Sequence, residues 1–560
     1  MSDTKKQIRI AILCRGHRFD AWEAECIRQV QQLPFVKIVL LISEPDSQEQ
    51  PKGFLHKLTH YPYRNFLWRF YKRFQLKISA YNSVSLEKEL KNVPVLKCVP
   101  ELKGKYSQHI SANDIQEIKS HQPDVILRFA YNILRGEILT VAKYGVWSFH
   151  HADEQIIRGG PGAFWEMYTN NPVTGAILQR LTEKLDAGII LRKGHFQTIR
   201  HSYKGNLEQL LWGTTTWMKQ ALIDVANGIS PALDGKPIET KAKIFTFPKN
   251  YQMIRFIRER RRQKIKFHFR ELFRPEHWNV GIVHQSADSI LAKGISEVEW
   301  LPEPNANEYY ADPFGWEEKE ELKIVFEYYD YKIRKGILSS FTQSTKTFKT
   351  ILDAKVHLSY PFVIERSDDN KSNHVILPES NQANNVFCFD SGNPKNGKIL
   401  IENIPAVDST PLLFNNRWWM FCTHEGDYNN TNLYLYHAEH FEGPWEAHQN
   451  NPVKCDVRSA RPGGTPFVRD GKLYRPAQDC STSYGSAIVI NEITELSEIS
   501  FSEKTIARIV PNNKWKFNKG LHTFSIVGKN TVLIDAKRYA FNFDNFTHVF
   551  GKKLNRLFRK

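Results

Sequence analysis

The 560-residue sequence predicts a Rossmann-type α/β domain followed by an all-β five-bladed propeller. In the first half, short apolar runs alternate with helical patterns, which is typical of a parallel sheet covered by helices. In the second half, many short strands are separated by turn residues, and one strand–turn–strand plan recurs about every 50 residues, a period typical of propeller blades. We therefore expect an α/β domain over 1–230, a basic, partly helical linker over 231–277 and a propeller over 278–560.

The α/β half is predicted from its buried strands. The apolar runs 8–16 and 36–44 indicate two strands, with a helix over 22–33 between them. Another buried strand is expected over 123–130. The first strand ends in the residues CRGH and not in a GxGxxG loop, so we expect no dinucleotide-binding fingerprint.

The propeller is predicted from four similar segments and a weaker fifth. Each has a polar residue, a proline with an apolar pair, a polar turn and an aromatic-rich strand that ends in an acidic or polar residue. This pattern and its period indicate propeller blades, so we infer five of them. The segments begin near residues 310, 360, 408, 463 and 521.

Composition favours an anionic partner and a reducing compartment. The net charge of +17 makes phosphates, nucleic acid or an anionic membrane candidate partners, with a merely solvated basic surface as the alternative. The seven cysteines form no CxxC pair, which argues against a disulfide framework or a zinc ribbon. We recognise no signal peptide and no apolar run long enough to cross a membrane, and we therefore expect a cytoplasmic protein.

Two segments, 52–77 and 251–277, interleave Lys and Arg with Phe, Tyr, Trp or Ile, and the C-terminal residues 551–560 are also basic. Such segments can lie on an anionic membrane surface, so we expect possible peripheral attachment to a membrane. The alternative is that their aromatic side chains pack inside the protein. No RNA-binding motif is recognisable, so we expect no nucleic acid partner.

The stretch 144–194 combines several motifs that carry chemistry. WSFHH is expected to end a buried strand, and ligands of open α/β sheets bind beyond the carboxyl ends of the strands. RGGPG is a turn before a helix, TGAILQRL is a strand, and LDAG is a turn beside it. This arrangement brings His150 and Asp186 within reach of each other.

These motifs resemble the catalytic core of the folate-dependent formyltransferases, which include methionyl-tRNA formyltransferase and the sugar N-formyltransferases. The similarity covers roughly 8–225 and is clearest over 120–195. It implies a formyltransferase-like α/β fold, formyl-tetrahydrofolate as cofactor and transfer of a formyl group to an amine. The residues that match the family motifs are Ser148-Phe149-His150, Arg158-Gly159-Gly160, Thr174-Gly175 and Leu185-Asp186-Ala187-Gly188.

Formyl transfer to an amine needs a donor for the developing oxyanion and a base for the amine proton. His150 suits either role, and Asp186 would orient the imidazole or accept the proton. Ser148 stands where the family has Asn and is a shorter donor. His151 and Asp153 are a second possible acid/base pair, and the structural alternative is that the histidines only pack. We expect Arg158, Gly159, Gly160 and Asp153 to contact the substrate.

In a five-bladed propeller, residues at equivalent blade positions line one mouth of the central channel. The repeat places Asp312, Tyr360, Asp408, Arg461 and His522 there, and Glu327 and Glu379 end following strands. Carboxylates accept hydrogen bonds from sugar hydroxyls and aromatic rings stack on sugar faces, so this ring suits a carbohydrate. The alternative is that Asp312 and Asp408 cap turns of the blades.

The phrases ADPFG, SYPFVIE, LPES and VDSTP resemble the five-bladed family-43-type glycoside hydrolases and, more closely, the propeller domain attached to glucosamine inositolphosphorylceramide transferases. The resemblance covers roughly 278–545 and implies carbohydrate handling. Hydrolysis would need suitably spaced carboxylates, for which Asp312, Asp408 and Glu379 are candidates. We favour sugar binding over hydrolysis.

Together these features predict a transferase of glycan or glycolipid biosynthesis. It would move a formyl or related acyl group to an amino-sugar or lipid-linked glycan acceptor held by the propeller. One alternative is glycosyl-transferring or glycoside-hydrolase-type activity in the propeller beside a diverged α/β domain. Another is a non-catalytic carbohydrate-binding protein. We expect no metal site, and the oligomeric state is left open.

Overall fold

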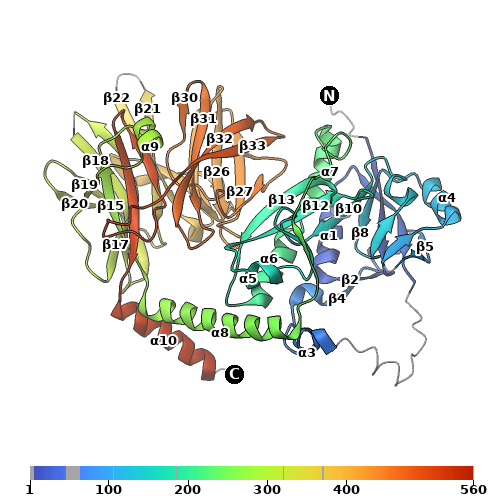
Figure 1. The fold of residues 1–560 in the computed structure, drawn as a ribbon. Helices are drawn as coiled ribbons and strands as arrows, with labels where there is room; N and C mark the ends of the chain where they lie inside the picture. Colours follow the sequence, from blue (N-terminus) through green and yellow to red (C-terminus); the bar gives the residue numbers. More distant parts are fainter. Residues whose placement is uncertain are drawn as a thin grey trace. The chain divides into compact units, whose positions relative to one another are not determined.

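The computed structural model describes residues 6–45, 63–104, 106–184, 187–319, 321–368 and 371–558. The chain folds as two compact units, Met1–Lys264 and Ile265–Lys560 (Figure 1). The division falls inside helix α8 (Asn250–Phe273), within the predicted linker 231–277. Residues 46–62 and 185–186 lie outside the described residues, so part of segment 52–77 and the predicted site residue Asp186 have no structural account.

The N-terminal unit is built on a seven-stranded sheet with the order β13-β12-β10-β8-β1-β3-β5. Strand β1 pairs in parallel with β3 and β8, and β8 pairs in parallel with β10, whereas β12 and β13 are antiparallel to their neighbours. The carboxyl ends of β1, β8 and β10 therefore share one edge of the sheet. The strands are β1 (Ile8–Cys14), β3 (Val36–Ser43), β5 (Val95–Lys97), β8 (Val125–Arg128), β10 (Val146–His150), β12 (Val173–Arg180) and β13 (Ile189–Gln197).

Helices and short strands surround this sheet. The predicted helix 22–33 and the predicted strands 8–16, 36–44 and 123–130 are confirmed, each within a few residues of its expected ends. Helix α1 packs beside α7. The helices are α1 (Ala21–Gln31), α3 (Phe66–Phe74), α4 (Ala112–Ser120), α5 (Phe164–Tyr168), α6 (Tyr203–Gly213) and α7 (Trp217–Asn227), and the short strands are β2 (Arg18–Asp20), β4 (Ser83–Ser85), β6 (Glu101–Lys103), β7 (Ser107–His109), β9 (Ile133–Arg135), β11 (Ile157–Gly159) and β14 (Lys243–Phe245).

The described part of the C-terminal unit contains five antiparallel sheets. Four of them follow one another along the chain, and the fifth pairs β15 and β16 from the start of the unit with β34 and β35 from its end. The strands, sheet by sheet, are β17 (Glu308–Glu318), β18 (Glu321–Asp330), β19 (Lys335–Thr342) and β20 (Thr347–Leu352); β21 (Ser359–Asp368), β22 (Lys371–Glu379), β23 (Asn385–Asp390) and β24 (Asn393–Glu402); β25 (Ala406–Phe414), β26 (Arg417–His424), β27 (Asn432–Ala438), β28 (Glu446–Ala447) and β29 (Lys454–Cys455); β30 (Phe467–Arg469), β31 (Lys472–Asp479), β32 (Ala487–Leu496) and β33 (Phe501–Ile509); and β15 (Glu276–Val283), β16 (Glu299–Trp300), β34 (Phe524–Val527) and β35 (Thr531–Tyr539).

The predicted repeat has a structural counterpart in the first strand of three sheets. Strands β17, β21 and β25 each carry a register shift near the start. At that bulge, Asp312, Tyr360 and Asp408 have positive φ angles of 53°, 43° and 52°. A bulge re-aims the side chain that it carries, and bulges are common beside functional sites. The three residues therefore occupy equivalent positions, as the sequence repeat predicted.

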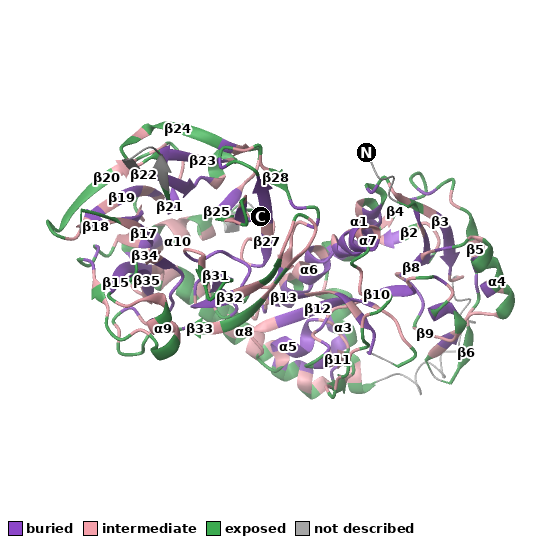
Figure 2. Ribbon diagram, turned by 90° about the horizontal axis from the view of Figure 1, so that it is seen from above, coloured by how far each residue is buried: buried purple, intermediate pink, exposed green. Residues whose placement is uncertain are grey.

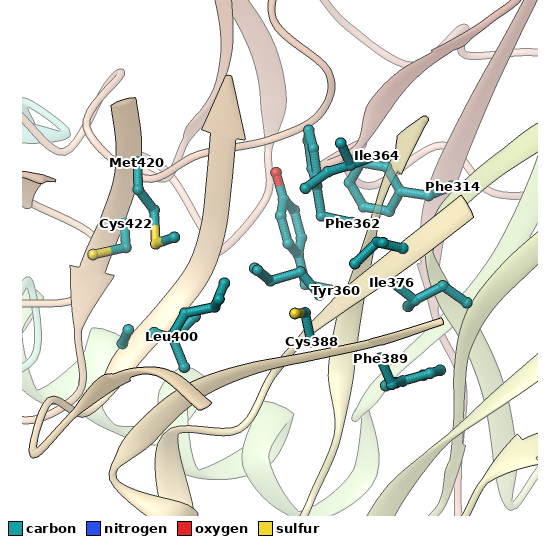
Figure 3. Packing of buried hydrophobic residues seen from close by; sticks show 14 of the residues in the cluster. Phe314, Tyr360, Phe362, Ile364, Ile376, Cys388, Phe389, Leu400, Met420 and Cys422 are labelled. Carbon is teal, nitrogen blue, oxygen red and sulfur yellow. The ribbon is translucent and has the colours of Figure 1, made fainter. Parts of the chain in front are cut away.

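Hydrophobic clusters connect the sheets in order and then connect the last to the first. Figure 3 shows a cluster that joins the sheets of β17, β21 and β25 through residues such as Phe314, Tyr360 and Met420. Further clusters join the β25 sheet to the β30 sheet, the β30 sheet to the β15 sheet, and the β15 sheet back to the β17 sheet. Strands β20 and β24, at the ends of their sheets, are largely exposed (Figure 2).

Helices α9 (Ala287–Lys293) and α10 (Phe543–Phe558) complete the C-terminal unit. Helix α10 packs against the last turns of α8: the rings of Phe273 and Phe546 lie 5.3 Å apart, and Asn545 donates a hydrogen bond to the Glu271 carbonyl. Among the described residues, we find no helix with the length and apolar character needed to span a bilayer.

Candidate functional site

His150 stands at the carboxyl end of β10, where two cavities meet. In the sheet, Ser148 pairs with Arg128 of β8, and His150 pairs with Ile177 of β12. A cavity of about 190 Å³ lies on one side and a cavity of about 510 Å³ on the other, and His150 lines both. Two ligands, one in each cavity, would therefore meet at this imidazole.

Arg128 provides the main charge of the smaller cavity. Its guanidinium donates hydrogen bonds to the Ser148 hydroxyl (2.8 Å) and to the carbonyls of Tyr131 (2.7 Å) and Asn132 (2.6 Å). Burial lowers the pKa of Arg128 to about 10, so the group stays cationic at neutral pH. Ser148 therefore acts together with Arg128, which offers N–H donors that a serine alone lacks.

The larger cavity has aromatic walls and few charges. Burial raises the pKa of Asp20, and it raises that of Tyr81 to about 12, so the phenol stays neutral. Aromatic walls with a few polar groups suit a sugar face, because pyranose rings stack on aromatic rings. The aromatic lining comes from Trp68, Tyr81, Phe149, Tyr203 and Phe247, and the charged lining from Asp20 and Lys72.

The RGGPG turn forms one wall of the larger cavity. Strand β11 pairs with β14 so closely that a side chain at Gly159, whose φ is 79°, would begin 2.2 Å from the Phe245 carbonyl oxygen. Gly160 accepts a hydrogen bond from the Trp165 indole, which fixes the turn. Gly159 lines the cavity, and Arg158 lies half-buried in β11 beside it.

The LDAG turn reaches the smaller cavity through Gly188. The Gly188 N–H donates to the Gln179 side chain at 3.2 Å, and Thr182 donates to the Ala187 carbonyl at 2.8 Å. Both Gly188 and Thr182 line the cavity together with His150. Asp186 itself lies outside the described residues, so its expected proximity to His150 stays a prediction.

The expected pairing of His151 with Asp153 is not what the structure shows. His151 stacks on Phe149 with an interplanar angle of 10°, and burial lowers its pKa to about 3, so it packs as a neutral ring. Asp153 contacts Lys193 at 2.9 Å and His195 at 3.4 Å. Burial alone would raise the pKa of Asp153, but these contacts hold it well below its usual range. The physical reason is that each group has another partner: the His151 ring is buried against Phe149, and Lys193 and His195 hold the Asp153 carboxylate.

Asp408 and Arg461 form a buried ion pair in the C-terminal unit. Arg461 contacts the Asp408 carboxylate at 2.6 and 3.3 Å, and Gln478 donates to the same carboxylate at 3.0 Å. The next acid, Glu379, lies 4.0 Å from Arg461. The Arg461 guanidinium also lies over the Tyr484 ring, 5.0 Å from its centroid.

His522 lies between two carboxylates in the same region. Its Nδ1 is 2.6 Å from Asp535 and its Nε2 is 3.4 Å from Asp312, and the ring stacks on Trp278 at 3.9 Å. Burial disfavours the protonated form of His522, but the nearby Asp535 and Asp312 carboxylates outweigh this effect and raise its pKa. Asp312, His522 and Asp535 have ligand-type atoms within 4.8 Å of one another. These ligand-type atoms could hold a metal ion, whereas a protonated imidazole between the two carboxylates would form an ion triad instead.

Two buried glutamates complete the predicted ring. Burial and the neighbouring acids raise the pKa of Glu327 and of Glu379 well above their usual range. Glu327 lies 3.5 Å from His357. The structure therefore brings six of the seven predicted residues together: Asp312, Glu327, Glu379, Asp408, Arg461 and His522. The seventh, Tyr360, contacts this group through its N–H, which donates to Asp312.

These acids also connect neighbouring sheets. Asp535 of β35 accepts the Asp312 N–H at 2.9 Å, and Asp312 of β17 accepts the Tyr360 N–H at 3.3 Å. The Tyr360 hydroxyl bonds to Thr410 of β25 at 2.9 Å. These bonds support a structural role for Asp312, in which it holds neighbouring sheets together. A role in binding carbohydrate is the other interpretation of the same residues.

Comparisons with known proteins divide the chain in the same way. Residues 284–538 match the family described as glucosamine inositolphosphorylceramide transferase 1, N-terminal. Over 209 residues the chain is 31% identical to glucosamine inositolphosphorylceramide transferase 1 of Oryza sativa subsp. japonica, covering 35% of this chain and 27% of that protein. Over 98 residues it is 30% identical to methionyl-tRNA formyltransferase of Clostridium perfringens, covering 17% of this chain and 32% of that protein. The predicted resemblances to glucosamine inositolphosphorylceramide transferases and to formyltransferases are confirmed.

The chain is also similar to solved formyltransferase structures at low sequence identity. One similar solved structure is the N-formyltransferase from Helicobacter canadensis in complex with folinic acid and dTDP-3-aminofucose, with a TM-score of 0.27 and 12% identity over 43% of this chain and 71% of that chain. The chain spans only about a quarter to a third of the length of the curated relatives named above.

Two residues of these sites are absent from the sequence predictions. Arg128 ends an otherwise apolar buried strand, and a charged residue at that position could have indicated a functional site. Asp535 lies inside strand β35 among buried residues, and a buried acid there could likewise have indicated a functional or paired group.

Proposed function

We propose that the chain is a transferase of glycan or glycolipid biosynthesis whose N-terminal unit moves a formyl, or related acyl, group to the amine of a sugar. The observation that carries this proposal is the position of His150, which borders both cavities beside Arg128 and Ser148. The acyl donor would occupy the smaller cavity and the amino sugar the larger, aromatic one.

The chain's own residues can perform the two tasks of acyl transfer to an amine. As the amine nitrogen bonds to the acyl carbon, negative charge develops on the acyl oxygen, and the N–H groups of Arg128 and the Ser148 hydroxyl can stabilise it. The amine must lose a proton. His150 Nε2 lies 3.4 Å from the Ile157 carbonyl, so a proton held there leaves Nδ1 to accept the amine proton. When the charge on the acyl oxygen returns to the carbonyl, the bond between the acyl carbon and the donor nitrogen would break, and the proton taken up by His150 can pass to that departing nitrogen.

A formyl-tetrahydrofolate would supply the acyl group at the formyl oxidation level. The residues present fit the planar pterin end of such a molecule, because the amides of Asn132 and Gln179 and the Thr182 hydroxyl offer both donors and acceptors. A cavity of about 190 Å³ suits one bicyclic ring, with the remainder of the molecule outside. The charges of Arg135 and Lys184 at this cavity suit an anionic tail.

The C-terminal unit, in this proposal, is a five-bladed propeller that holds the glycan. The support is the cyclic order of hydrophobic packing among its five sheets and the sheet shared by the first and last strands. The carbohydrate would contact the buried ring around Asp312 and Asp408.

A second candidate function is glycosyl-transferring or hydrolase-type chemistry in the C-terminal unit. It is favoured by the raised pKa of Glu379, an acid that lies beside the Asp408–Arg461 pair. Asp408 is held by Arg461 and Gln478, which favours a binding role over a free catalytic base.

We further propose that the protein is cytoplasmic and attaches to a membrane that carries the glycan. In the C-terminal unit, α10 exposes Phe550, Leu554 and Phe558 along one side, with Lys552 nearby, and the adjoining end of α8 exposes Phe269. A helix with this mixture can lie in an anionic interface. Residues 559–560 of the basic C-terminus lie outside the described residues.

The function is tested by formyl transfer from labelled 10-formyltetrahydrofolate to a panel of nucleotide-linked and lipid-linked amino sugars. We expect His150→Asn to lower kcat by about 10²–10⁴-fold, the range for loss of a general base. His284→Asn, an exposed histidine of the C-terminal unit, is the matched control and should retain full activity. Equal activity of wild type and His150→Asn would refute the proposal and leave the second candidate.

A further inference from the structure

A third cavity, of about 530 Å³, lies in the N-terminal unit and has no part in the reaction proposed above. It is bordered by the end of α5, the segment after β13 and the first half of α8. Its lining combines apolar contacts from Met167 and Phe256 with an unusual number of arginines, which are Arg200, Arg255, Arg258, Arg260 and Arg262.

The arginines reach the cavity from two separate parts of the chain. Arg255, Arg258 and Arg262 recur at the spacing that places residues on one face of helix α8. Arg200 approaches from the segment after β13. The lining contains one carboxylate, Glu259, which is occupied by Arg262 at 2.7 and 2.9 Å. Five guanidinium groups thus surround one carboxylate.

Most of this charge has no carboxylate partner in the described chain. Arg200 donates to the Asn170 carbonyl at 3.3 Å, and Arg260 donates to the Tyr71 hydroxyl at 2.5 Å, both neutral acceptors. Arg255 lies over the Tyr168 ring at 4.9 Å. For Arg258, no hydrogen bond or ion pair occurs with any residue that the structure describes. Burial lowers the pKa of Arg200, which is the sign of a guanidinium held partly away from water.

We infer that this arginine cavity binds a phosphate-bearing small ligand, with a diphosphate as the group that best matches its charge. Like charges held around a partly enclosed cavity repel one another, and an anion removes that cost. Guanidinium groups bind phosphate oxygens through paired N–H donors, and several of them can share one diphosphate. The cavity volume of about 530 Å³ suits a small ligand.

The diphosphate could belong to a nucleotide-linked sugar or to the headgroup of a membrane lipid. Tyr168, Met167 and Phe256 offer apolar contacts for the part of the ligand beyond the phosphates. The inference does not depend on acyl transfer at His150, because the cavity shares no lining residue with the two cavities that His150 borders.

The test is calorimetric titration of the full-length chain with inorganic pyrophosphate and with uridine diphosphate, alongside sedimentation with phosphatidylinositol phosphate vesicles. We expect the double variant Arg255→Gln/Arg258→Gln to raise Kd at least about tenfold. Arg261→Gln is the matched control, because Arg261 lies on the same helix, is exposed and does not line the cavity. It should bind as tightly as the wild type.

The variants also separate specific binding from general attraction. If the double variant unfolds, the single variant Arg258→Gln serves instead, since its side chain has no described partner to lose, and about a threefold increase in Kd is expected. Tighter binding of uridine diphosphate than of vesicles supports a nucleotide ligand, and the reverse supports a lipid headgroup. Absence of binding to all three probes, or equal weakening by Arg261→Gln, overturns the inference.

Discussion

Replacement of Asp408 by asparagine tests how the charged centre of the C-terminal unit is held together. Asp408 and Arg461 are 2% and 8% exposed, and their charged atoms approach to 2.6 Å. Loss of one partner from such a pair leaves a buried, uncompensated charge and costs about 3–5 kcal/mol of unfolding free energy. Asparagine preserves the shape of the side chain, so the change is mainly one of charge.

The structure also predicts a partial compensation. Glu379 lies 4.0 Å from Arg461, and burial together with the neighbouring Asp408 raises its pKa. Without the charge on Asp408, Glu379 can ionise and pair with Arg461. We therefore expect Asp408→Asn to cost about 3 kcal/mol, the low end of the range for a broken buried pair. The double variant with Glu379→Gln should cost about 1–2 kcal/mol more than the sum of the single changes, as residues of one network do.

Urea unfolding followed by tryptophan fluorescence measures these differences. The control is Glu442→Gln, which breaks the exposed Lys398–Glu442 pair and should cost less than about 1 kcal/mol. A cost for Asp408→Asn no larger than that of the control would refute the reasoning. Glycan binding by a folded Asp408→Asn chain would separate the structural and carbohydrate interpretations.

Three further predictions concern the pH dependence of stability, the membrane and the reaction. Glu166 is 1% exposed with no hydrogen-bond partner for either oxygen in the described chain, and burial raises its pKa from 4.5 to about 8. Between these two pKa values the folded state therefore holds a proton that the unfolded state releases, and the unfolding free energy falls as the pH rises. Between pH 5 and 7, this fall should be steeper in the wild type than in Glu166→Gln by about 1.4 kcal/mol per pH unit. Urea denaturation measures both curves, and parallel curves would contradict the prediction. Phe550→Ser/Leu554→Ser should abolish flotation with anionic vesicles, whereas Phe348→Ser on β20 should not, and binding to neutral vesicles would contradict an electrostatic contribution. Arg128→Lys should lower kcat about 10²–10³-fold with little change in the KM of the acceptor, and an effect on KM alone would assign Arg128 to binding.

The α/β half could be predicted because its buried strands are continuous apolar runs whose order along the chain fixes a parallel sheet. The sequence repeat located Asp312 and Asp408 because the same bulge recurs at each. His151 was misleading because it follows His150 directly in the sequence, yet its ring is buried against Phe149 and its pKa is lowered by that burial.

Other features depend on contacts that no local pattern records. Asp535 reaches Asp312 only because the last strands pair with the first strand of the unit. Arg128 meets Ser148 through a pairing between separate strands. The arginine cavity combines Arg200 with helix α8, so the basic helix alone could suggest a linker or a membrane surface but not a cavity.

The most direct test of acyl transfer at His150 is calorimetry of the full-length chain with 5-formyltetrahydrofolate, a stable form of the proposed donor. We expect saturable binding with Kd below about 1 mM. Asn132→Trp, which introduces a large ring at the edge of the smaller cavity, should weaken it at least about tenfold, whereas Asn393→Trp on the exposed strand β24 should have no effect. Absence of binding by the wild type at millimolar ligand, or equal binding by wild type and Asn132→Trp, would contradict the account.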